Sequence, residues 1–180
     1  MCIRQQAGTM KRTPARNGFL LAFVIFVLDQ ASKAAFLHMR DPFNPDGLAV
    51  LPIFRLVYVQ NFGVSLGLFT AQSDAQRWAL VAVTLLISIS AAIWLARETN
   101  RYEALGLGMI VGGAAGNVLD RVRLGYVVDF LNLHFGGWSP FLVFNVADSA
   151  ITLGVLVLLA RALMAGPKEQ KLADRPTGEE

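Results

Sequence analysis

The segment 78–96 most constrains what this chain can fold into. It reads WALVAVTLLISISAAIWLA and contains no charged residue. An α-helix needs about twenty consecutive apolar residues to cross the hydrocarbon core of a bilayer. The whole chain has the same character: 54% of its residues are hydrophobic and 16% are charged, whereas roughly a quarter are charged in a soluble domain. The sequence therefore predicts a membrane protein with a single domain.

Three further apolar segments predict further helices. The first, GFLLAFVIFVL at 18–28, follows a basic tail and could also be a cleaved signal peptide. We favour a retained helix, because Asp29, Lys33 and the apolar residues 34–37 extend it to a membrane-spanning length. The expected spans are about 18–37, 77–96, 104–120 and 141–161, between an N-terminal tail (1–17) and a C-terminal tail (164–180).

The connection 38–76 differs from the predicted helices in composition. Residues 50–69, VLPIFRLVYVQNFGVSLGLF, are rich in β-branched and aromatic side chains, and Phe54, Leu56 and Tyr58 fall on one face of a strand. Asn61 and Gly63 then indicate a turn or bulge. The predicted fold class is an all-α membrane protein of four transmembrane helices with a small extracytoplasmic β-rich segment.

Basic residues predict the orientation. Ten Lys and Arg residues lie in the N-terminal tail, in the 97–103 loop and from Arg161 to the C-terminal end, against five in and beside the connections 38–76 and 121–140. Cytoplasmic loops carry the excess of positive charge in membrane proteins. Both termini are therefore expected in the cytoplasm. This bias also explains the basic pI of about 9.4 better than nucleic-acid binding does, since no basic face with interleaved aromatic residues is present.

On this topology, polar side chains of three helices fall into one layer near the outer surface. Asp29 lies about 12 Å below the outer end of its helix, at 1.5 Å per residue. Asp148, seven residues after Phe141, should reach a similar depth. The layer also includes Asn117 and Asp120 at the end of the third span and Asn145 in the first turns of the fourth, while the loop residue Asp129 could fold back onto it.

Structural roles are an alternative for most of these residues. Asp29 and Lys33 are spaced for an ion pair within one helix, and Asp120 could pair with its neighbour Arg121. Asn117 and Asn145 could simply hold helices together, and the glycines of GGAAG (112–116) favour close helix packing. Asp148 has no basic residue within a helical turn, and apolar residues flank Asp129 on both sides. Bare acids in such surroundings indicate function.

Two carboxyl groups close together in a low-dielectric layer cannot both ionise easily. The ionised group can take a proton from water while the neutral group donates to a carbonyl oxygen, which is the chemistry of an aspartic peptidase. A serine mechanism fits less well, because Ser32 and Lys33 are adjacent and point about 100° apart on a helix. The single Cys2 and the distant His38 and His134 predict neither a metal site nor a cofactor.

Two other classes of function remain open from the residues alone. Membrane carboxyl groups also bind protons or cations in small transporters. A membrane scaffold without chemistry is the third possibility. The asparagines beside each acid and the lack of an internal repeat favour the peptidase.

Four motifs in this order resemble the lipoprotein signal peptidases (signal peptidase II), membrane aspartic peptidases of bacteria. They are DQASK (29–33), QNFGVSLGLF (60–69), GGAAGNVLDR with GYVVDF (112–130) and FNVADS (144–149). The resemblance covers about residues 18–163. The second motif departs from the family pattern N-x-G-A-A-F at Val64, Ser65 and Leu66 but keeps Asn61 and Gly63.

The resemblance implies removal of signal peptides from prolipoproteins that carry diacylglycerol on the lipobox cysteine, with the cut just before that cysteine. It implies a multi-pass protein of the bacterial inner membrane, active on the extracytoplasmic side, in contact with membrane lipid, inhibited by globomycin and expected to be a monomer. Asp129 and Asp148 would form the catalytic pair, and we choose Asp129 over Asp120 because Arg121 should keep Asp120 ionised. The supporting residues would be Asp29, Lys33, Asn61, Asn117, Asp120, Arg121 and Asn145.

Overall fold

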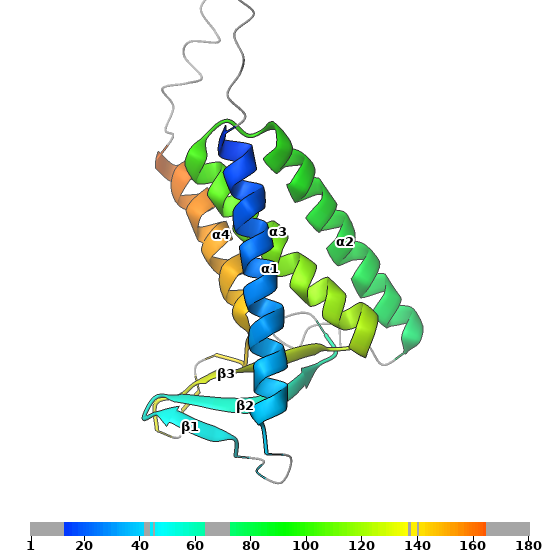
Figure 1. Ribbon diagram of the computed structural model, residues 1–180, viewed down its shortest axis with the longest axis vertical. Coiled ribbons are helices and arrows are strands. Elements are labelled where there is room, and N and C mark those ends of the chain that lie inside the picture. Colours follow the sequence, from blue (N-terminus) through cyan, green and yellow to red (C-terminus); the bar gives the residue numbers. More distant parts are fainter. Residues whose placement is uncertain are drawn as a thin grey trace, which may run out of the picture.

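The described part of the chain forms four helices and a small sheet (Figure 1). The computed structural model describes residues 13–41, 44, 46–63, 73–136, 138–139 and 141–164. The altered positions of the second motif, 64–66, lie outside these residues. The elements are α1 (Thr13–Met39), β1 (Leu48–Leu51), β2 (Phe54–Asn61), α2 (Asp74–Arg97), α3 (Arg101–Leu124), β3 (Val127–Leu133) and α4 (Val146–Met164).

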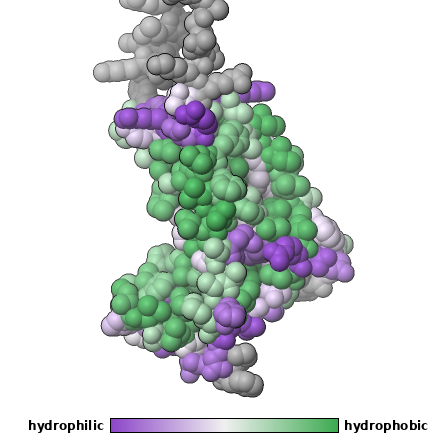
Figure 2. All heavy atoms as spheres, in the orientation of Figure 1, coloured by the Kyte–Doolittle hydropathy of each residue, from purple (hydrophilic) through white to green (hydrophobic). Residues whose placement is uncertain are grey.

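Three of the described helices, α1, α2 and α4, are long and apolar enough to cross a membrane. Hydrophobic side chains cover the middle of the helical bundle, and hydrophilic ones gather toward its ends (Figure 2). Helix α1 is continuous through Asp29 and Lys33, as expected of a retained helix. Helix α3 is the most buried of the four helices, and its glycines and charged side chains make it less apolar.

Glycines allow α3 to pack closely against its neighbours, which confirms the packing predicted for GGAAG. A Cβ on Gly112 would collide with the carbonyl oxygen of Ala22 on α1, and one on Gly113 with the carbonyl oxygen of Ala147 on α4. Backbones can approach this closely only where side chains are absent. Helix α3 thus brings α1 and α4 together around itself.

The sheet lies at one end of the bundle, with antiparallel strands in the order β1-β2-β3. The last turns of α1 pack on it: the rings of Phe36 and Phe130 stack with their centroids 5.0 Å apart. The strand predicted around Phe54, Leu56 and Tyr58 is confirmed as β2, which ends at Asn61. The all-α expectation was too simple, because the connection 121–140, expected as a loop, contributes β3.

The fourth helix begins later than predicted. Residues 141–145 are not helical, because Phe144 joins the edge of the sheet instead. Its backbone N–H donates to the carbonyl of Leu131 at 3.0 Å, and its own carbonyl accepts from the N–H of Leu131 at 2.8 Å. This pairing ties the start of α4 to β3. The start of α1 and the end of α4 lie at the other end of the bundle (Figure 1).

Candidate active site

Asp129 lies in the middle of β3, not on a loop as predicted, and faces Val59 of β2 across the ladder. Its side chain is only 2% exposed. Two amides donate to its carboxylate: Nδ2 of Asn61 to Oδ2 at 3.0 Å, and Nδ2 of Asn145 to Oδ1 at 2.7 Å. The sheet therefore presents Asp129 in a fixed orientation, with both oxygens hydrogen-bonded.

Asp148 lies in the first turn of α4, and Asn145 immediately precedes the helix. The prediction that Asn145 also lies within the helix was wrong, because residues 141–145 are not helical and Asp148 is only the third residue of α4. The two residues instead cap the helix reciprocally. Oδ1 of Asn145 accepts from the N–H of Asp148 at 2.9 Å, and Oδ2 of Asp148 accepts from the N–H of Asn145 at 3.3 Å. A helix start with this box is well defined.

Asn117 of α3 connects these groups. Its Nδ2 donates to Oδ1 of Asp148 at 2.9 Å, and its Oδ1 accepts from Nδ2 of Asn145 at 3.2 Å. Nζ of Lys33 donates to the same oxygen at 3.2 Å. Asn117 of α3 and Asn145, just before α4, thus form one hydrogen-bonded network with both acids.

Lys33 also forms buried ion pairs with Asp29 and Asp120, each at 2.8 Å. The predicted pair of Asp29 and Lys33 is confirmed. The predicted partner of Asp120 was wrong: neighbouring helix residues point about 100° apart, so Arg121 faces elsewhere. The Nη2 of Arg121 donates to the carbonyl of Gly63 at 2.6 Å, which holds the chain just after β2.

Burial, and to a smaller extent the negative charge of Asp148, raise the pKa of Asp129 to about 6. The hydrogen bonds from Asn61 and Asn145 and the charge of Lys33 act in the opposite direction. A carboxyl group with a pKa near 6 can hold or release a proton near neutral pH, as general acid–base chemistry requires.

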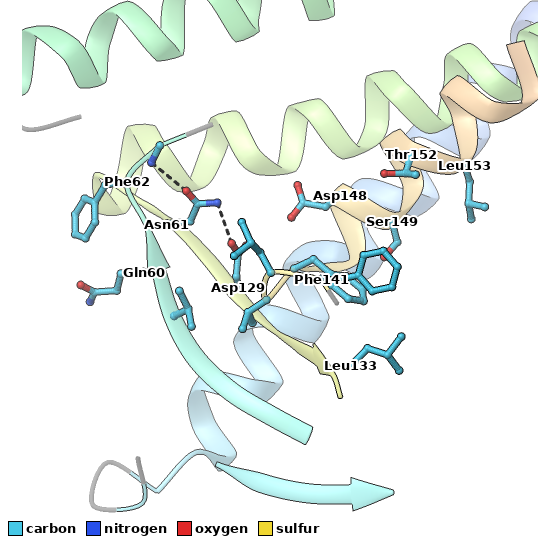
Figure 3. Close-up of a pocket in the computed structure, with 15 residues that line it drawn as sticks. Gln60, Asn61, Phe62, Asp129, Leu133, Phe141, Asp148, Ser149, Thr152 and Leu153 are labelled. Carbon is cyan, nitrogen blue, oxygen red and sulfur yellow. Dashed lines mark hydrogen bonds between the residues drawn. The ribbon is translucent and has the colours of Figure 1, made fainter. Parts of the chain in front are cut away.

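A cavity of about 820 Å³ opens beside the two acids. Figure 3 shows Asp129 and Asp148 among its lining residues, with Asn61 next to Asp129 and Ser149 and Thr152 further along α4. Most of the lining is apolar, and Phe141, Leu142, Phe144 and Leu153 contribute to it. The cavity can therefore take an extended, largely hydrophobic ligand and expose it to two carboxyl groups.

Sequence reasoning missed one polar residue at this site. Gln30 lies between the acids of α1 and α3, where its Nε2 donates to Asp29 at 3.1 Å and to Asp120 at 3.0 Å. Its signal was available, because Gln30 is a polar residue inside a predicted membrane helix. In the described part of the chain, no cluster of His, Cys, Asp and Glu is arranged to hold a metal ion.

A family model described as signal peptidase (SPase) II matches residues 21–164. The chain belongs to the signal peptidase II family. It is 43% identical to a lipoprotein signal peptidase of Sphingopyxis alaskensis over 90% of this chain and 94% of that protein. It is 48% identical to one of Rhizorhabdus wittichii over 82% of this chain and 86% of the relative.

Two solved structures of bacterial membrane enzymes have the same fold. One superimposes with a TM-score of 0.74 at 23% identity and covers 92% of this chain and 95% of its own. The other has a TM-score of 0.70 at 25% identity, over 82% of this chain and 93% of its own. The protein is thus a multi-pass bacterial membrane enzyme: a signal peptidase II, an aspartic peptidase that cleaves the signal peptides of prolipoproteins. Family membership favours this function over the transporter and the scaffold.

Proposed function

We propose that Asp129 and Asp148 are the catalytic pair, acting on diacylglyceryl-modified prolipoproteins and cutting just before the lipidated cysteine. The observation that carries this proposal is that two acids from separate elements line one apolar cavity and share Asn145 as a hydrogen-bonding partner. Asp120 is the weaker candidate, because its carboxylate is engaged by Lys33 and Gln30 and does not line the cavity.

In the proposed reaction, one aspartate is ionised and the other neutral. The ionised group takes a proton from water, whose oxygen attacks the scissile carbonyl, while the neutral group donates a proton to the carbonyl oxygen. The C–N bond then breaks, and the leaving amine of the lipidated cysteine takes up the proton removed from water. A hydroxyl of the tetrahedral intermediate returns its proton to the other aspartate as the carbonyl re-forms, so the pair recovers its starting state. Asn61, Asn117 and Asn145 hold the two carboxyl groups through the hydrogen bonds described above.

The site is proposed to face the extracytoplasmic side, with both tails in the cytoplasm and α3 as a fourth span. The excess of basic residues in the tails and the 97–103 loop supports this orientation. So does the position of the sheet, at the end of the bundle away from the start of α1 and the end of α4. The domain would comprise residues 18–163, with the tails outside it.

Substrate is proposed to enter from the membrane. Its acyl chains would lie among outer-leaflet lipids, and its scissile peptide would occupy the cavity beside Phe141 and Phe144. The connection 38–76 would cover the bound peptide, and Arg121 would support this cover through Gly63. A globomycin-type cyclic peptide would compete for the same cavity. One chain carries both acids, which supports a monomeric enzyme.

Separate Asp129→Asn and Asp148→Asn variants test the proposal on a purified diacylated prolipoprotein, with the inserted amount of each variant measured. Each should lose nearly all cleavage, because an amide can neither take a proton from water nor supply an acidic one. Asp41→Asn is the control, since this exposed acid lies outside the cavity. Cleavage near the wild-type rate by either active-site variant would refute the pair.

A further inference from the structure

The residue before each candidate catalytic acid donates its backbone N–H to another buried carboxylate. The N–H of Ala147, one residue before Asp148, donates to Oδ1 of Asp29 at 3.0 Å. The N–H of Val128, one residue before Asp129, donates to Oδ2 of Asp120 at 3.3 Å. A buried carboxylate therefore holds the backbone immediately before each catalytic candidate.

The two holding carboxylates are themselves joined. Nζ of Lys33 lies 2.8 Å from Oδ2 of Asp29 and 2.8 Å from Oδ2 of Asp120. Nε2 of Gln30 donates to both carboxylates as well, at 3.1 and 3.0 Å. Asp29, Lys33 and Asp120 are at most 4% exposed. We call Asp29, Gln30, Lys33 and Asp120 the backbone clamp.

This arrangement has a physical reason to be rigid. Two buried carboxylates repel each other unless a cation and further donors lie between them, and Lys33 and Gln30 occupy that position. Gly116 of α3 leaves room for the cluster, because a Cβ there would collide with Oδ2 of Asp29. Each carboxylate bonds Lys33 and Gln30 and also one backbone N–H. A shift of Lys33 or Gln30 would therefore move a carboxylate, and with it the backbone next to a catalytic candidate.

We propose that the backbone clamp sets the position of β3 relative to α4, and with it the separation of the two catalytic carboxyl groups. Gln30 and Lys33 are then positioning residues of the peptidase reaction and contact no substrate. The inference rests on the proposed pair of Asp129 and Asp148. It assigns a function to Gln30, and to the main chain of Val128 and Ala147, beyond stabilising the fold.

The sharpest test is Gln30→Met, which keeps an unbranched helix-forming side chain and removes the hydrogen bonds donated to Asp29, to Asp120 and to the carbonyl of Gly116. Small displacements of catalytic groups reduce turnover by up to about a hundredfold. We expect a loss of kcat of about tenfold or more, with KM for the diacylated prolipoprotein within about twofold, because the cavity lining is unchanged. Ser32→Ala is the matched control, since its hydroxyl bonds only the carbonyl of Asp29 within its own helix.

A second pair of variants distinguishes an effect on the position of the catalytic acids from an effect on the stability of the fold. Lys33→Met leaves two acids without a cation, so it should lose kcat and thermal stability together. Adding Asp120→Asn removes the excess charge and keeps an oxygen for the N–H of Val128. The kcat of the double variant should therefore be at least about tenfold higher than that of Lys33→Met alone.

A normal kcat in well-folded Gln30→Met would overturn the inference, as would a lowered thermal midpoint at unchanged kcat. A double variant that regains stability without regaining kcat would also contradict it. These outcomes leave the catalytic pair intact as long as Asp129→Asn and Asp148→Asn are inactive. Activity in those two variants would instead refute the pair itself.

Discussion

Removal of the Asn61 amide should change the pH dependence of cleavage in a defined direction. In Asn61→Ala, Asp129 loses the hydrogen bond donated to Oδ2 at 3.0 Å. That bond stabilises the ionised carboxylate, so its loss raises the pKa of Asp129. The bond from Asn145, at 2.7 Å, is left in place and keeps the side chain oriented.

The expected size of the pKa shift follows from the partly exposed position of Asn61. A hydrogen bond to a charged group contributes about 1.5–3 kcal/mol, and we take the lower end because solvent can replace part of it. One pKa unit corresponds to about 1.4 kcal/mol. The pKa of Asp129, about 6 in the wild type, should therefore rise by about one unit.

The assay is kcat/KM for diacylated prolipoprotein in lipid-containing micelles, from about pH 5 to about pH 9. If Asp129 is the general base, the acid limb of the profile moves up by about one unit. If Asp129 is the general acid, the alkaline limb moves up instead. The same experiment therefore identifies which aspartate carries the proton, subject to the coupling of the pair.

Asn132→Ala is the matched control. Asn132 lies on β3, three residues from Asp129 and on the opposite face of the strand. Its Oδ1 has no hydrogen-bond partner among the described residues, so both limbs should stay in place. Limbs that do not move in Asn61→Ala, or that move to lower pH, would refute the role given to this amide.

Three further predictions follow from the same contacts. The raised pKa of Asp129 means that its contribution to stability is fully present below its unfolded value near 4 and is lost as the pH rises through about 6. Near pH 8, Asp129→Asn should therefore unfold at a higher temperature than the wild type, and its free energy of unfolding should be higher by up to about 3 kcal/mol. Near pH 4 the variant should show no gain in stability. A gain of equal size at both pH values would contradict this. Gly116→Ala should reduce kcat by displacing Asp29, and an unchanged kcat would show that the carboxylate has room to move. A chelator should leave the rate unchanged, because the carboxyl groups activate the water in an aspartic peptidase.

Local patterns account for what the sequence predicted well. The uncharged run 78–96 lies within α2, the spacing of Asp29 and Lys33 produced the expected ion pair, and the glycines of 112–116 pack against neighbouring backbones. Each of these outcomes depends on residues close together in the chain or on the small size of glycine. The β-branched and aromatic residues of the short segment 127–133 (VVDFLNL), which follows Gly125, were also a usable signal for β3, and it was missed.

By itself, the sequence determined that this chain enters a membrane, that it forms four helices in this order, and which acids are candidates for catalysis. Only the tertiary structure decided which groups hold those acids. Asp120 turned out to bond Lys33 rather than its neighbour Arg121, and Asp29 bonds the N–H of Ala147, 118 residues away. Hydrogen bonds act over about 3 Å in space, so the partner of a buried carboxylate depends on how helices and strands pack and not on their order along the chain.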